Sequence, residues 1–284
     1  SNIIFGDTNF GYILLAATLP FFLFILLKNI TSKKVSIYLI ISFIFIPIFE
    51  SIGFGYFNYI GQVTRNHAET FSITLIIIVL AFLTSKKYKK KDDYLSLFLL
   101  TILLSLSTFA RPNFFPTTII LVSYLLLISF QNRNFLNLIF IIFGFIFFFL
   151  SLIHNIYFGQ TFHLFTISKA HFLFSDFYTN LDAENLGSNK LILQIMKWNP
   201  IEYFYRIIIL GIICFYIIKY RNNLFTYTLF LCSISQHGVL ILTHPDSRYA
   251  YLAWLLTFIL FIQLSYKNNL FNSIYSRFFS KKNV

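Results

Sequence analysis

The residues of this chain that could do chemistry fall in three short clusters. They are Arg65–Glu69 (Arg-Asn-His-Ala-Glu), Arg111–Asn113 (Arg-Pro-Asn) and Thr243–Tyr249 (Thr-His-Pro-Asp-Ser-Arg-Tyr). Each cluster contains an arginine, which can grip phosphate through paired N–H donors. Two of them add a histidine and a carboxylate, the groups that transfer protons in general acid–base chemistry.

The first cluster ends where an apolar segment begins, and it leaves several roles open. Glu69 can act as a general base, bind a metal, or pair with Arg65. The alternative is an interfacial ion pair at a helix N-terminus, a place that favours a carboxylate in any case.

The other two clusters also have structural alternatives. Arg111, before Pro112, can be an arginine at a helix stop whose side chain extends to the membrane surface. In the third cluster, His244 can donate or accept a proton and Arg248 can bind phosphate. Its alternative is a tight turn in which Asp246 merely pairs with Arg248.

The elements that carry these clusters are those of a membrane protein. Hydrophobic residues make up 57% of the 284 residues and charged residues 11%, more apolar material than a soluble core of this size would bury. We predict an all-α, polytopic fold with about nine transmembrane helices, forming a single transmembrane domain over residues 1–284. The predicted spans are Phe10–Leu27, Val35–Phe49, Thr70–Thr84, Tyr94–Ala110, Pro116–Phe130, Leu138–Tyr157, Phe204–Ile218, Leu224–Leu242 and Tyr251–Tyr266.

The lysine-rich segment Lys86–Asp93 sets the predicted orientation, because clustered lysines stay on the cytoplasmic side. All six histidines, and every carboxylate except Asp92 and Asp93, then fall on the outer side. The longest outer segment is Phe158–Tyr203, in which Thr161–Phe174 is expected to form a helix parallel to the membrane. We expect a bacterial inner membrane protein whose site faces the periplasm.

The net charge of +12 follows from this topology, because the basic residues gather on the inner side. It predicts affinity for anionic membrane lipids and no nucleic-acid partner. Cys214 and Cys232 lie in apolar segments, so neither a disulfide nor a zinc site is expected. No spacing demands a divalent metal, although Asp7, Glu69 and Asp246 are able to bind Mg²⁺ or Mn²⁺.

The layout of these clusters resembles a known class of membrane enzymes. An outer Arg111-Pro112 after the fourth span, Glu69 before the third span and the late His244-Pro245…Arg248-Tyr249 together resemble the GT-C glycosyltransferases. Within that class the chain looks most similar to bacterial proteins related to dolichyl-phosphate-mannose protein mannosyltransferases and lipid-A aminoarabinose transferases. The resemblance implies transfer of a hexose or pentose from a polyprenyl-phosphate-linked donor to a lipid, glycan or protein acceptor.

The resemblance also implies roles for individual residues. Catalytic roles fall to Asp7, Glu69 and His67, the carboxylates being candidate bases. The residues implied to bind substrate are Arg65, Arg111, His244, Asp246, Arg248 and Tyr249. Among these, Arg111 and Arg248 would hold the carrier phosphate.

One feature departs from the class pattern. Its catalytic carboxylate lies in an outer loop after a first span, whereas here Asp7 would fall at the end of such a loop. We therefore expect that a span and a catalytic aspartate lie upstream of Ser1, and that this chain is incomplete as an enzyme. The alternatives are an O-antigen polymerase or ligase, a transporter or flippase, and a purely structural membrane subunit.

Overall fold

The computed structural model describes residues 8–46, 55–65, 67–85, 93–160, 162, 164, 200–220, 222–242 and 247–268. Within these ranges the secondary structure is helical, with no strand, so the predicted all-α class is confirmed. The helices are α2 (Thr8–Ile30), α3 (Lys33–Phe45), α4 (Tyr56–Thr64), α5 (Ala68–Leu83), α6 (Tyr94–Ala110), η3 (Pro112–Phe114), α7 (Phe115–Gln131), α8 (Phe135–Phe145), η4 (Ile146–Phe149), α9 (Leu150–Gly159), α13 (Pro200–Lys219), α14 (Leu224–Leu242) and α15 (Ser247–Lys267).

Among the described residues, four helical stretches are long and apolar enough to cross a membrane. They are Ile13–Ile30, Pro112–Gln131, Phe135–Phe158 and Ala250–Lys267. Ala68–Leu83 and Tyr94–Ala110 are equally apolar but shorter. Large apolar side chains such as Ile218 (80% exposed) also face outward, as expected of a surface that meets lipid. The chain therefore has the helices of a membrane protein, and the number of nine crossings stays a prediction.

Several predicted boundaries differ from the structure. Residues assigned to an outer loop form helix α4, and α5 begins at Ala68, which places Glu69 in its first turn. Helix α13 begins at Pro200, four residues before the predicted Phe204, and α15 begins at Ser247 in place of Tyr251. The predicted straight span Leu138–Tyr157 is interrupted by the 3₁₀ turn η4. The expected membrane-parallel helix at 161–174 lies outside the described residues, apart from residues 162 and 164.

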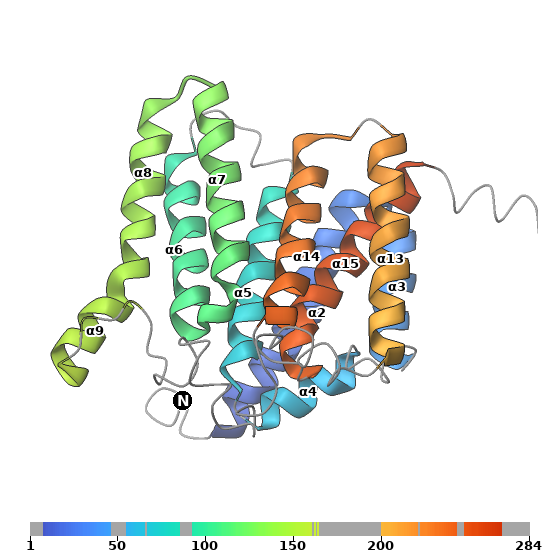
Figure 1. Cartoon of the computed structure of the whole chain (residues 1–284), viewed down its shortest axis with the longest axis horizontal. Coiled ribbons are helices and arrows are strands. Elements are labelled where there is room, and N and C mark those ends of the chain that lie inside the picture. Colours follow the sequence, from blue (N-terminus) through green and yellow to red (C-terminus); the bar gives the residue numbers. More distant parts are fainter. Residues whose placement is uncertain are drawn as a thin grey trace, which may run out of the picture.

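The helices form one bundle with two chemically different ends (Figure 1). At one end the Asn29 amide donates to the Ala81 carbonyl and to Thr84 Oγ1, both at 3.2 Å, so α2 and α5 finish side by side. Lys267 Nζ donates to Asn222 Oδ1 at the same end, beside the α13–α14 turn. This end of the bundle carries Lys267 and is called the lysine end below; it is at the top of Figure 1. The opposite end, where α5 and α15 begin and α6 finishes, is called the Glu69 end below.

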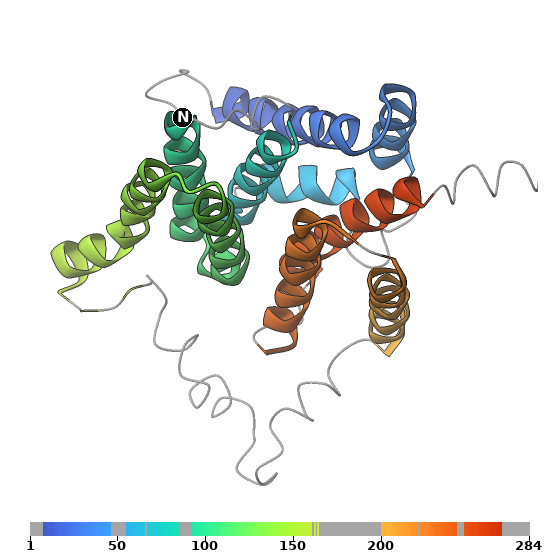
Figure 2. The ribbon, with the colours of Figure 1, turned by 90° about the horizontal axis from the view of Figure 1, so that it is seen from above.

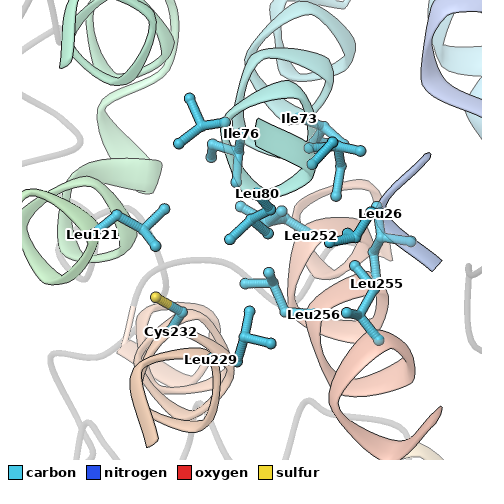
Figure 3. Packing of buried hydrophobic residues seen from close by; sticks show 14 of the residues in the cluster. Leu26, Ile73, Ile76, Leu80, Leu121, Leu229, Cys232, Leu252, Leu255 and Leu256 are labelled. Carbon is cyan, nitrogen blue, oxygen red and sulfur yellow. The ribbon is translucent and has the colours of Figure 1, made fainter. Parts of the chain in front are cut away.

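Helices α5 and α15 form the centre of the bundle. Almost every residue of α5 from Glu69 onward is buried, and so are most residues of α15. Viewed from above, α8 and α9 lie on one side of the bundle and α13 on the other (Figure 2). Five helices meet in the core that Figure 3 shows, which contains Leu26, Ile73, Ile76, Leu80, Leu121, Leu229, Cys232, Leu252, Leu255 and Leu256. This packing fixes both helices whose first turns carry candidate site residues.

Helices α6 and α8 approach each other closely at Gly144. A Cβ atom there would lie 2.8 Å from the Phe98 carbonyl oxygen and 2.8 Å from Thr101 Cβ. Ser105 Oγ donates to the Gly144 carbonyl at 3.3 Å across the same contact. Small residues at a contact between apolar helices allow the backbones to pack directly, which contributes to helix association inside a membrane.

Candidate functional site

Glu69 and Arg111 form an ion pair at the Glu69 end, with Arg111 Nη2 donating to Glu69 Oε1. Glu69 is in the first turn of α5, and Arg111 is the residue at which α6 ends. Each charge is therefore at the helix terminus that favours its sign. The Glu69 side chain is 1% exposed and that of Arg111 is 30% exposed, so the carboxylate is enclosed while the guanidinium reaches the surface.

Hydrogen bonds between neighbouring helices hold this pair in place. Ser72 Oγ, one turn after Glu69, donates to the Ser107 carbonyl at 2.9 Å and so joins α5 to α6. Thr108 Oγ1 donates to Thr118 Oγ1 at 2.7 Å and joins α6 to α7. The turn that follows Arg111 contains Pro112, whose ring cannot continue α6 and is compatible with the start of η3. The pair is thus set in a rigid frame of three helices.

The second carboxylate oxygen of Glu69 is the chemically distinctive atom. Oε2 is buried and has no hydrogen-bond partner among the described residues. Buried polar atoms are normally paired, and a catalytic role is one explanation for an exception. Oε2 can accept a hydrogen bond from a hydroxyl group beside the Arg111 guanidinium.

Helix α4 closes the Glu69 end from below in Figure 1 and carries the buried Tyr59 and the partly buried Tyr56. Thr74 Oγ1 donates to the Thr70 carbonyl, so Tyr59 Oη, 2.7 Å away, is the donor to Thr74. Tyr56 Oη donates to the Ala16 carbonyl at 2.8 Å. Burial raises the pKa of both phenols, which therefore keep their donor protons. The Tyr59 ring also lies 5.8 Å from that of Tyr251, so α4 links α2, α5 and α15.

The structure brings some of the predicted site residues together and separates others. Glu69 pairs with Arg111 and not with Arg65, which is exposed at the end of α4. Arg111 does end α6 and is partly exposed, as the helix-stop alternative expects, and its side chain also pairs with Glu69. His67 precedes α5, and its carbonyl accepts a hydrogen bond from Thr70.

The third cluster is described only in part. Helix α15 begins at Ser247, so Arg248 and Tyr249 lie in its first turn, where the backbone alone is described. Asp7, His244 and Asp246 lie outside the described residues.

A second polar cluster, between α13, α14 and α15, was not predicted. Arg206 Nη1 is 2.8 Å from His237 Nδ1, and His237 Nε2 is 3.0 Å from Thr257 Oγ1. Trp254 packs against both: its ring centre is 5.2 Å from Arg206 Cζ and 5.0 Å from the His237 ring centre. Arg206 and His237 are only 4% and 3% exposed.

The sequence contained one signal for this cluster. Proline is favoured in the first turn of a helix, so Asn199-Pro200 marks the start of α13 and places Arg206 well inside it. The prediction that began the span at Phe204 left Arg206 near the surface.

No group of three or more histidine, cysteine, aspartate or glutamate side chains that could hold a metal ion occurs in the described part of the chain. Asp7 and Asp246 lie outside that part, so a site that uses Mg²⁺ or Mn²⁺ stays a prediction. Glu69 is paired with a cation, an arrangement that competes with metal binding.

Comparisons with protein-family models, with curated proteins and with solved structures found no match to this chain. The features of the chain that bear on its function are the Glu69–Arg111 pair, the Arg206–His237 cluster and the apolar helices long enough to cross a membrane.

Proposed function

We propose that this chain is a membrane glycosyltransferase, or the larger part of one, with a GT-C-like arrangement of about nine spans. It transfers a sugar from a polyprenyl-phosphate-linked donor to a lipid, glycan or protein acceptor. The observation that carries the proposal is the contact between Glu69 and Arg111, which are 42 residues apart in the sequence. It joins a buried carboxylate and a partly exposed cation at the end of the bundle opposite Lys267.

The pair matches the needs of glycosyl transfer. The acceptor hydroxyl oxygen forms a bond to the anomeric carbon while the bond from that carbon to the donor phosphate oxygen breaks. A carboxylate takes the hydroxyl proton, and fixed cations stabilise the departing lipid phosphate. Glu69 Oε2 is suited to the first task, and Arg111 with Arg248 to the second.

The positions of the charges support an outward-facing site. Lys267, Asn29 and the α13–α14 turn are at the lysine end, opposite Glu69. Because clustered basic residues stay in the cytoplasm, the Glu69 end would face the periplasm of a bacterial inner membrane. Lipid-linked sugar donors can reach such a site along the membrane surface.

The experiment that tests the proposal is sugar transfer and donor binding by the full-length natural protein in proteoliposomes with labelled polyprenyl-phosphate sugars. Wild type should bind the donor, and Glu69→Gln should keep binding while losing transfer. Arg248→Ala should weaken donor binding. Arg133→Asn, which removes an arginine at the lysine end, is the matched control, because asparagine tolerates the positive φ of 53° found there. Absence of donor binding and turnover across several sugars and acceptors would refute the proposal.

The enclosed Arg206 favours a transporter or flippase as the second candidate. An ionisable side chain buried within membrane helices is typical of substrate pathways. Uptake of a lipid-linked sugar into proteoliposomes without chemical change would support this function. Use of a pyrophosphate-linked oligosaccharide would instead indicate the polymerase or ligase alternative.

A further inference from the structure

Two consecutive residues of α14 connect the two polar clusters. Gln236 Nε2 donates to the carbonyl of Asn113, in the η3 turn that follows Arg111, at 3.3 Å. His237 contacts Arg206 of α13 and Thr257 of α15. Gln236 is 2% exposed and His237 3% exposed, so both contacts are inside the bundle.

The hydrogen bonds around His237 have defined donors and acceptors. Thr257 Oγ1 donates its single proton to the Ala253 carbonyl at 2.8 Å. It must then accept from Ser233 Oγ at 2.7 Å and from His237 Nε2 at 3.0 Å. His237 therefore carries a proton on Nε2, and its Nδ1 lone pair accepts from Arg206 Nη1. His237 therefore accepts a hydrogen bond from the Arg206 cation of α13 and donates one to Thr257 of α15.

This link meets α15 beyond its first turns, ten residues after Ser247. Trp254, one turn earlier, packs on His237 and Arg206, and Tyr251 packs on Tyr59 of α4. The rotation of α15 about its own axis is therefore fixed on two sides. That rotation decides which way the first turn of α15 faces.

We propose that Gln236 and His237 are positioning residues that hold the Arg111 turn and the start of α15 in one fixed relation. Gln236 holds the Arg111 turn through its hydrogen bond to Asn113, and His237 holds α15 through its hydrogen bond to Thr257. The inference rests on the proposed function, in which Arg111 and Arg248 bind the phosphate of the lipid-linked donor. Neither Gln236 nor His237 touches that phosphate.

Four variants separate this role from a general loss of packing. Gln236→Leu removes the donor to Asn113 in the η3 turn. Gln263→Leu is its control, since Gln263 is also buried and donates one hydrogen bond, which joins α15 to Thr226 Oγ1 of α14 away from that turn. His237→Asn places an acceptor where Nδ1 is and keeps the Arg206 contact. His237→Gln places a donor where Nε2 is and keeps the Thr257 contact.

Two readouts are needed. The first is donor KM and kcat, for which displacement of a phosphate ligand by about 1 Å should raise KM on the order of tenfold to a hundredfold. The second uses Trp254, which is the sole tryptophan after Trp198→Phe because the chain has two. Its fluorescence is recorded while polyprenyl phosphate, without a sugar, is added to proteoliposomes, so that the positions of the helices are followed without turnover.

The expected result is a raised donor KM in Gln236→Leu and His237→Asn. The donor KM should stay near normal in Gln263→Leu and His237→Gln. Ligand binding should also change the Trp254 fluorescence, and Gln236→Leu should weaken that change. Equal KM and equal fluorescence titrations in Gln236→Leu and Gln263→Leu would overturn the inference. If the full-length wild type binds polyprenyl phosphate but transfers no sugar, the proposed function fails, and the fluorescence titration alone decides the positioning role. Absence of binding by wild type would overturn both.

Discussion

Removal of either partner of the Glu69–Arg111 pair should have unequal consequences for stability. Arg111→Gln leaves the carboxylate of Glu69 enclosed at 1% exposure and without its cation. Loss of one partner of a buried pair costs about 3–5 kcal/mol of folding free energy. Glu69→Gln leaves Arg111 with 30% of its side chain exposed and keeps an amide oxygen as acceptor, so we expect a loss of about 1 kcal/mol.

The double variant Glu69→Gln/Arg111→Gln completes the cycle. Two amides can hydrogen-bond to each other, so the double variant should be more stable than Arg111→Gln alone. Unfolding free energies are measured in mixed micelles with increasing denaturing detergent, followed by circular dichroism. If Glu69→Gln proved as destabilising as Arg111→Gln, or the double variant were the least stable of the three, the difference in burial would not control the pair.

Three further predictions concern packing. Gly144→Ala should lower the free energy of unfolding by about 1–3 kcal/mol, because its Cβ would meet the backbone of α6. Gly211→Ala, with nothing within 4 Å, should not lower it. Thermal unfolding in detergent compares the two variants, and equal losses of stability would contradict the close approach of α8 and α6. Tyr59→Phe removes the hydrogen bond to Thr74 and should cost about 1 kcal/mol by the same assay, and an unchanged stability would show that α4 is held by stacking alone. A maleimide should label Cys214 faster than the fully buried Cys232 in folded protein, and equal rates would show that α14 is not enclosed as described.

The parts of the fold that the sequence predicted best are those with local stop signals. The predicted bounds Tyr94–Ala110 and Leu224–Leu242 coincide with α6 and α14. In the first case Arg111-Pro112 ends the helix, and in the second polar residues flank an apolar run. Helix α4 was missed because it is short and amphipathic and follows glycines, a pattern that also fits a loop.

The partners within the candidate site were harder to predict. Pairing with Arg65, four residues away, is one of the roles that the sequence leaves open for Glu69, but Ala68 begins a new helix that turns the carboxylate toward the end of α6. Which distant arginine it meets depends on how α5 packs on α6, and that depends on contacts such as Ser72 with Ser107. Likewise, His237 and Arg206 are ordinary polar residues in the sequence until α13 and α14 lie side by side.

The turn η4 bears on how the chain fits a bilayer. The apolar stretch Phe135–Phe158 has 24 residues, which as a straight helix would be about 36 Å long, against a hydrocarbon thickness of about 30 Å. The 3₁₀ turn at Ile146–Phe149 interrupts it, and α9 leaves the direction of α8 (Figure 1). The exposed rings of Tyr157 and Phe158 are then at the far end of the bent segment, where aromatic side chains anchor to the headgroup region. A change in the angle at η4 alters the thickness that this segment spans, so the bundle can meet thinner and thicker bilayers without tilting as a whole.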